Sequence, residues 1–382
     1  MKSKTFVNGW LCAAVIGAGL LSGCASRRPI LVGFAGELSG KNADLGTHGR
    51  DGAQLAVETL NATDGIAGRP IELLVRDDLG TPEGARAADR ELIDAGVVAI
   101  IGHMTSGQSM AALPVTEEAG VVLLSPTTST TELSGLDDHF FRVNPVNALA
   151  ARTLARHIYQ HHSMSRMAAI YDTDNAAYTK TFWTAFAEAY RALSGQVTGE
   201  AAFSSAGEPD FAPLVAELQA TGPDGLLIIA SALDTALIAQ QTRLSDWQIP
   251  LFASSWAQTE TLPQNGGQAV EGIEIVMQYD SNSQKSAFLE FRAHYQERFG
   301  RAPTFAAAQA YEAVLVLAAA LEKTGGQAEG LPQALLETQS FEGLVGTISL
   351  DEYGDVVRTQ FLVTVQDGQF VTLAALEPEE PE

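Results

Sequence analysis

Three histidines close together are the strongest candidates for metal chemistry in this chain. His157 and His161 are four residues apart, so one face of a helix could present both imidazoles to a cation, and His162 follows directly. No glutamate lies between them as in a His-Glu-x-x-His motif, and the surrounding residues are polar, as at a helix end. We therefore expect a structural or solvated role for these histidines and no metal site.

Two further segments are incomplete versions of known motifs. Residues 172–175 (Asp-Thr-Asp-Asn) begin like a calcium loop but lack its glycine at the sixth position and its glutamate at the twelfth. Ser106 follows His103 by three residues, which is not the Gly-x-Ser-x-Gly arrangement of a nucleophilic serine, and the sequence contains neither a Walker A loop nor Gly-x-Gly-x-x-Gly. The sequence therefore predicts no enzyme and no cofactor. An enzyme built on Ser106 and His103 remains an alternative.

Small hydroxyl side chains follow two predicted core strands. Residues 102–107 read Gly-His-Met-Thr-Ser-Gly, and residues 125–130 read Ser-Pro-Thr-Thr-Ser-Thr. Loops at the carboxyl ends of parallel strands are where open α/β sheets bind ligands, and helix N-terminal amides with hydroxyls can hold a carboxylate. The same residues could also serve only as caps and turns. Their joint occurrence after two such strands favours a carboxylate site.

Alternating strand and helix patterns must position these loops. From residue 30 onward short apolar runs alternate with helical periodicity, which predicts an α/β protein with parallel sheets. A first doubly wound unit is expected over residues 29–145 and a similar one from residue 167. The expected strands are 30–34, 71–75, 97–101, 121–124, 167–171, 226–230 and 251–253, and the expected helices include 53–60, one starting at Thr81-Pro82, 178–193 and 305–321. A pair of short strands, 347–350 and 361–365, is expected near the end.

Composition and charge exclude several classes of protein. The 382 residues are 46% hydrophobic and 18% charged, which is typical of a globular protein of two or three domains. A formal net charge of −23 would repel a phosphate backbone, so nucleic acid is not expected as a partner. Cys12 and Cys24 are the only cysteines, so the body of the chain can form neither a disulfide framework nor a thiolate zinc cluster.

The first residues have the pattern of an export signal. Lys2 and Lys4 precede an apolar run at 10–21 that is too short to span a membrane, and residues 21–24 (Leu-Ser-Gly-Cys) resemble a bacterial lipobox. We predict a lipoprotein signal peptide at 1–23 and acylation of Cys24. A general secretory peptide with an incidental cysteine is the alternative. At the other end, residues 376–382 are expected to form a disordered acidic tail.

Several segments in their order along the chain resemble one family. They are residues 30–34, 38–40, 61–68, 70–73, 77–78, 101–103, 124–126, 291–311 and 346–355. The chain resembles the leucine/isoleucine/valine-binding family, the type I periplasmic solute-binding proteins of branched-chain amino acid ABC transporters. The resemblance implies two doubly wound α/β lobes joined by three crossovers that close like a hinge on a ligand. The first lobe would comprise 29–146 and 281–358, and the second 147–280 and 359–375.

The resemblance also implies site residues. Ser106 matches the serine that holds the ligand carboxylate, Ser129 stands where a threonine usually does so, and Thr127 lies where a backbone amide helps. Tyr178 matches a tyrosine of the second lobe that closes over the ligand.

Two positions of the expected site depart from the family pattern. Trp256 stands where an acidic residue should bind the ligand ammonium, and Leu45 replaces an aromatic residue. A buried ammonium without a carboxylate partner costs several kcal/mol, so a standard α-amino acid is in doubt unless Asp172, Asp174 or Asp234 substitutes. An indole offers a stacking or cation–π surface instead.

These features lead to one main hypothesis and its rivals. The chain is expected to be a monomeric, lipid-anchored, extracytoplasmic receptor that captures a small carboxylate-bearing solute and presents it to an inner-membrane ABC permease. The leaflet that holds the anchor stays open. The rivals are a sensor of amide, urea-like or aromatic compounds and a ligand-free outer-membrane interaction lipoprotein on the same fold.

Overall fold

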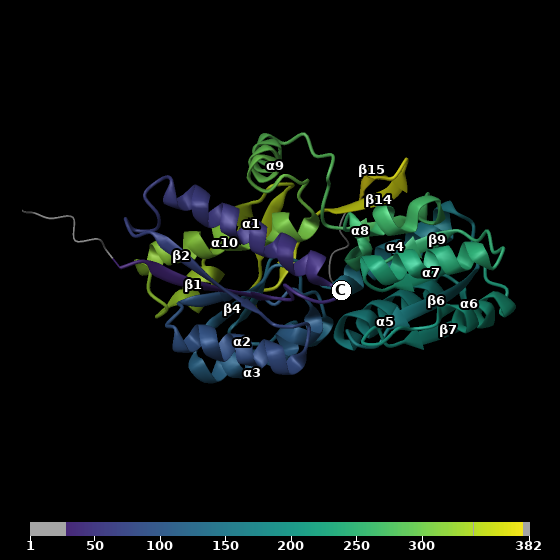
Figure 1. The fold of residues 1–382 in the computed structure, drawn as a ribbon, viewed down its shortest axis with the longest axis horizontal. Coiled ribbons are helices and arrows are strands. Elements are labelled where there is room, and N and C mark those ends of the chain that lie inside the picture. The colour runs from purple at the N-terminus through teal and green to yellow at the C-terminus, as the bar shows by residue number, and fades with distance from the viewer. Residues whose placement is uncertain (1–27, 339, 377–382) are drawn as a thin grey trace, which may run out of the picture.

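The computed structural model describes residues 28–338 and 340–376, which form two α/β lobes side by side (Figure 1). The first lobe holds a five-stranded parallel sheet with the strand order β2-β1-β3-β4-β5. Its strands are β1 (Ile30–Gly36), β2 (Ile71–Asp77), β3 (Ala99–Ile101), β4 (Val122–Ser125) and β5 (Phe140–Arg142). The doubly wound arrangement predicted from the sequence is thereby confirmed for this lobe.

The second lobe holds a seven-stranded sheet in the order β15-β14-β10-β9-β8-β6-β7. The strands β6 to β10 are parallel, whereas β14 runs antiparallel to both β10 and β15. Their bounds are β6 (Arg166–Asp172), β7 (Gln196–Phe203), β8 (Gly225–Ile229), β9 (Leu251–Ala253), β10 (Glu274–Met277), β14 (Gln360–Gln366) and β15 (Gln369–Leu376). A third, small antiparallel sheet joins β11 (Ser340–Glu342), β12 (Thr347–Leu350) and β13 (Val356–Val357).

Helices cover both faces of the first sheet (Figure 1). Every second side chain of β1, at Ile30, Val32 and Phe34, faces the core that the sheet shares with α1 and α10. On the other face, Ile100 of β3 and Leu123 of β4 belong to a separate core beneath α2 and α3. Burial on both faces explains why these strands are near-continuous apolar runs. The helices here are α1 (Ala43–Asn61), α2 (Pro82–Asp94), α3 (Ser106–Ala119), α9 (Ser286–Phe299), α10 (Phe305–Thr324) and α11 (Leu331–Leu336).

The second lobe contains five α-helices in the part of the chain that the structure describes. They are α4 (Asn147–His161), α5 (Ala176–Ala192), α6 (Phe211–Ala220), α7 (Ala232–Leu244) and α8 (Thr261–Gly266), with 3-10 turns at η2 (Ser255–Ala257) and η3 (Gly267–Val270). The remaining 3-10 turn, η1 (Thr131–Leu133), belongs to the first lobe.

Local sequence signals explain where the first-lobe helices begin. Thr81 caps α2 by accepting a hydrogen bond from the amide of Gly84 at 3.0 Å, and Pro82 occupies the first helical position, as the sequence predicts.

Among the described residues α10 is the one helix long and apolar enough to cross a membrane, yet 78% of its apolar window is buried in the protein. It packs along α1, which makes it a core helix.

Three chain segments cross between the lobes, after β5, after β10 and after β13. A buried ion pair fixes the third crossover: Arg358 lies 2.7 Å from Glu312 of α10 and also donates to the carbonyl of Val143 in the first crossover at 3.2 Å. Two crossovers are thus anchored to the same first-lobe helix. The residue-by-residue division into lobes stays a prediction.

Both short strands expected near the end of the chain are present, and they lie in different sheets: β12 pairs with β11 and β13, whereas β14 joins β10 in the other lobe. One expectation for the end of the chain is wrong. Leu376, expected in the disordered tail, is the last residue of β15 and pairs with Gln360. The rest of that tail, the signal peptide and Cys24 lie outside the described residues.

Candidate ligand site between the lobes

The N-terminus of α3 faces a cavity between the lobes. Its N-cap residue, Thr105, makes no side-chain capping hydrogen bond, and its buried hydroxyl has no partner. The amide of Gly107 donates to the side-chain oxygen of Asn175, which comes from the second lobe, at 3.1 Å. The positive end of the helix dipole favours an anion such as a carboxylate at this point.

The two hydroxyl-rich loops meet at this helix end. Ser106 is 2% exposed, and its hydroxyl accepts a long hydrogen bond of 3.4 Å from the amide of Ser129. Thr127 donates to the carbonyl of Met104 at 2.5 Å, which ties one loop to the other. Ser106, Thr127 and Ser129 therefore line the same cavity, as the sequence-based hypothesis requires.

Aromatic side chains form much of the opposite wall. Tyr178 and Trp256 from the second lobe meet edge to face with ring centroids 5.8 Å apart, and the Tyr178 hydroxyl lies 3.2 Å from that of Ser255. Phe305 and Leu45 add apolar surface from the first lobe. In this closed arrangement the space left between these side chains is about 20 Å³, which holds about one water molecule and lies below the usual range for ligand sites.

Within the described residues, no charged side chain lines this cavity. The three acids that could replace the missing carboxylate have other partners. Asp172 and Asp174 both accept from the Ser205 hydroxyl, at 2.7 and 3.2 Å. Asp234 forms an ion pair with Lys41 at 2.6 Å. Burial raises the pKa of Asp172, because it disfavours the charged form. The possibility that one of these acids meets a ligand ammonium is therefore not supported.

Polar contacts hold the lobes together at the mouth of the site. Asp44, in the first turn of α1, accepts from the hydroxyls of Thr259 and Thr261 in the second lobe at 2.6 and 2.9 Å. His48 is fully buried, and its Nε2 lies 2.7 Å from Glu260. Burial acts against ionisation, but the contact with His48 holds the pKa of Glu260 below its usual range. The structure thus shows the lobes in a closed arrangement.

The catalytic alternative fails on the geometry of His103. This fully buried imidazole has Nδ1 2.7 Å from Asp78 and Nε2 3.1 Å from Asp89. Burial opposes its charged form, but the two carboxylates raise the pKa of His103 to about 10. Both ring nitrogens are occupied, so His103 cannot accept a proton from Ser106. The pair is structural.

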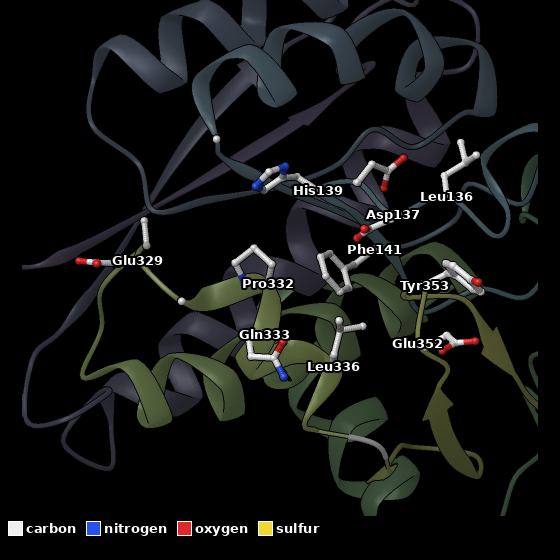
Figure 2. A pocket seen from close by; sticks show the side chains of 14 residues that line it. Leu136, Asp137, His139, Phe141, Glu329, Pro332, Gln333, Leu336, Glu352 and Tyr353 are labelled. Carbon is white, nitrogen blue, oxygen red and sulfur yellow. The ribbon is translucent and has the colours of Figure 1, made fainter.

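A larger hollow lies on the surface of the first lobe (Figure 2). It has a volume of about 440 Å³ and is open to solvent, with His139 and Asp137 on one side and Pro332, Gln333 and Leu336 on the other. Several acidic side chains line it, so it does not suit a carboxylate. The interlobe cavity combines helix amides, hydroxyls and aromatic rings and is the better ligand site.

Comparison with known proteins agrees with this architecture. A sequence model of the periplasmic binding proteins matches residues 29–369. The chain belongs to this family. Periplasmic binding proteins of this kind are solute-binding proteins and not enzymes, which confirms the expected absence of catalysis and the resemblance noted in the sequence.

Individual relatives are similar over nearly their whole length. The chain is 26% identical to Leu/Ile/Val-binding protein homolog 3 of Brucella melitensis over 356 residues, or 91% of this chain and 95% of the relative. It is 25% identical to the leucine binding protein of Thermotoga maritima, with a TM-score of 0.86 over 91% of this chain and 99% of that one. A solute-binding protein from Rhodopseudomonas palustris in complex with benzoate has the same fold at 21% identity and a TM-score of 0.83, covering 92% of this chain and 97% of that one.

Some residues of the cavity were not predicted from the sequence. Phe305, Asn175, Thr105 and Asn144 line it in addition to the residues carried over from the family resemblance. Thr105 could have been found, because it precedes the predicted start of a helix in a hydroxyl-rich loop. Phe305 lies far along the chain at the start of α10, and no local pattern connects it with the site.

Proposed function

We propose that this periplasmic binding protein serves an ABC importer and that its ligand is a small monocarboxylate without a free ammonium group. The observation that carries the proposal is the neutral lining of the cavity at Trp256, where an acid is expected. An α-amino acid would bring a buried ammonium with no carboxylate to pair it, which costs several kcal/mol. A carboxylate alone would instead meet the amides and hydroxyls at the start of α3.

The roles of the site residues follow from where they lie. Ser106, Thr127 and Ser129 would bind the ligand carboxylate together with the first amides of α3. Tyr178 and Trp256 would enclose the rest of the ligand, for which their rings offer a flat apolar surface. The space left in this closed arrangement is only about 20 Å³, so the side chains around it would have to move apart to admit a ligand.

Closure would couple binding to transport. A ligand that contacts both lobes interacts more strongly with the closed arrangement, and only such a difference can shift the population toward it. The closed form would then be the one presented to the inner-membrane permease. No hydrolysis or transfer step is needed in the binding protein.

Identification of the natural ligand tests this proposal. Protein purified from its own source should be denatured and the released small molecules identified by mass spectrometry, with a thermal-shift panel of acids, amides and amino acids as a second measurement. We expect a monocarboxylate that also raises the melting temperature. An α-amino acid as the released ligand would refute the proposed ligand class, and no shift with any solute would favour a ligand-free interaction protein.

A branched-chain amino acid is the second candidate ligand, because two of the relatives above are named for binding leucine or leucine, isoleucine and valine. For that ligand the side-chain oxygens of Asn144, Asn175 and Ser255 would have to replace the missing carboxylate. Neutral oxygens compensate a buried ammonium less well than a carboxylate does.

We also propose that Cys24 carries the lipid that anchors the protein outside the cytoplasm. The support is the lipobox-like sequence that ends at this residue. Radiolabelled palmitate should be incorporated into the wild type and into Cys12→Ser, because Cys12 belongs to the cleaved peptide, but not into Cys24→Ser. Label that persists in Cys24→Ser would show that the anchor is wrongly assigned.

A further inference from the structure

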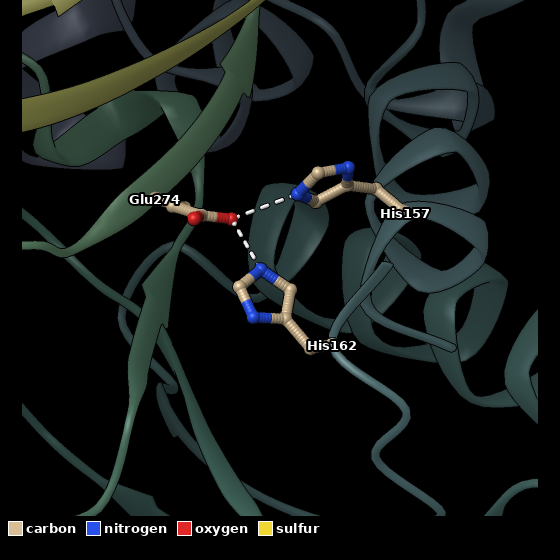
Figure 3. Close-up of side chains that lie close together, drawn as sticks. All are labelled: His157, His162 and Glu274. Atoms are coloured by element: carbon tan, nitrogen blue, oxygen red, sulfur yellow. Dashed lines mark hydrogen bonds and ion pairs between the residues drawn. The ribbon is translucent and has the colours of Figure 1, made fainter. Parts of the chain in front are cut away.

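Three side chains of types that can bind a metal meet in the second lobe (Figure 3), and none of them lines the ligand cavity. The Nε2 atoms of His157 and His162 lie 2.8 and 2.9 Å from the same carboxylate oxygen of Glu274. The potential ligand atoms of the three residues are all within 4.8 Å of one another. The sequence shows no glutamate between the histidines, but folding brings one from β10, more than one hundred residues further along the chain.

The set of donor atoms suits zinc. Two imidazole nitrogens and one carboxylate oxygen, with water in the fourth position, are a common ligand set for this ion. Bonds of about 2.0–2.2 Å in a tetrahedron place neighbouring ligand atoms about 3.3 Å apart, so the present hydrogen bonds need to open by only about half an ångström. The side chains of His157, His162 and Glu274 are 12%, 30% and 16% exposed, which leaves room for water beside them.

Neighbouring rings hold the two imidazoles in place. His157 stacks on His161 with centroids 4.9 Å apart, and His162 packs edge to face against Phe252 at 5.3 Å. Ligands that are already oriented lose less freedom when a metal binds. The strongly negative net charge of the protein also raises the local concentration of cations.

We propose that His157, His162 and Glu274 form a zinc site that joins the C-terminal end of α4 to the first residue of β10. All three residues belong to elements of the second lobe, so the site persists when the lobes open and does not depend on the identity of the transported solute. Zinc at this position would stabilise the second lobe by linking a helix to the sheet that it covers.

Calorimetric titration of the untagged mature chain with zinc chloride tests the proposal. We expect one zinc ion per chain and a loss of affinity of at least about tenfold in Glu274→Gln and in His162→Ala. His161→Ala is the matched control: it removes the ring that stacks on His157 but none of the three ligands, so the affinity for zinc should fall by no more than about threefold. Zinc should raise the melting temperature of the wild type and of the control, and not that of Glu274→Gln.

X-ray absorption at the zinc edge of the wild type gives a measurement that does not depend on any variant folding. It should show two imidazole ligands and only oxygen or nitrogen neighbours. Absence of zinc binding, or unchanged affinity in Glu274→Gln, would reduce the cluster to an ion pair. Loss of binding in His161→Ala with Glu274→Gln unaffected would assign the zinc to the helical pair His157 and His161 and overturn the proposed site.

Discussion

Replacing Ser106 by alanine probes the carboxylate end of the ligand site. The Ser106 hydroxyl is 2% exposed, and its hydrogen bond from the Ser129 amide is long, at 3.4 Å. It accepts in that contact, so its proton remains available for a ligand carboxylate. A hydrogen bond to a charged group contributes about 1.5–3 kcal/mol, so we expect Ser106→Ala to weaken binding by about 10- to 150-fold.

A neighbouring serine on the same helix provides the control. Ser109 is fully buried and its hydroxyl lies 2.7 Å from that of Thr128, but it does not line the cavity. We expect Ser109→Ala to lower the free energy of unfolding by about 1 kcal/mol while leaving the dissociation constant within about threefold of the wild type.

Isothermal titration calorimetry with the released ligand measures both variants, and circular dichroism melts report their stability. Unchanged affinity in Ser106→Ala, for a ligand that carries a carboxylate, would show that this carboxylate lies elsewhere. An equal loss in Ser106→Ala and Ser109→Ala would show that the effect comes from a disturbed α3 and would refute the reasoning about the hydroxyl.

Three further predictions concern selectivity, closure and pH. Trp256→Glu should restore a partner for an ammonium and raise the affinity for leucine at least about tenfold by calorimetry, and no gain would contradict the ligand argument. Asp44→Ala removes the hydrogen bonds that Asp44 accepts from Thr259 and Thr261 of the other lobe. Small-angle scattering with saturating ligand should therefore show a larger radius of gyration for this variant than for the wild type. Equal radii would show that these contacts do not hold the lobes closed. Burial raises the pKa of Glu37 from 4.5 to about 7, so the folded protein keeps a proton there that the unfolded chain has lost. The free energy of unfolding should therefore fall by at most about 3 kcal/mol as the pH rises from about 4.5 to about 7. In urea titrations at a series of pH values, Glu37→Gln should lose this decrease.

The inner strands of the first sheet were predictable because both of their faces are buried. Ile100 and Leu123 face one helical layer and Ile101 and Leu124 the other, so the sequence shows continuous apolar runs. Two other strands were not predicted because neither contains such a run: β7, at the edge of the second sheet, mixes exposed polar residues with small ones, and β5 has only three residues. The pairing of β14 with β10 depends on the third crossover, which no local pattern encodes.

The first-lobe half of the ligand site was also accessible from the sequence. Ser106 and Thr127 lie in loops that follow neighbouring parallel strands, and such loops must meet at one edge of the sheet. Asn175 and Phe305 join them only because the lobes close and because α10 packs beside the first sheet. Glu274 reaches the histidines for a similar reason, since the order of strands in the second sheet places β10 beside α4.

The central claim is that the cavity beside Trp256 accepts a carboxylate but has no partner for an ammonium. Calorimetric titration of the wild type with paired compounds that differ only in the α-amino group, such as leucine and 4-methylpentanoate or phenylalanine and 3-phenylpropanoate, tests it most directly. We predict that the deaminated acid of at least one pair binds at least about tenfold more tightly and that leucine, isoleucine and valine bind more weakly than about 0.1 mM. Tight binding of a branched-chain amino acid, with its deaminated partner weaker, would contradict the account.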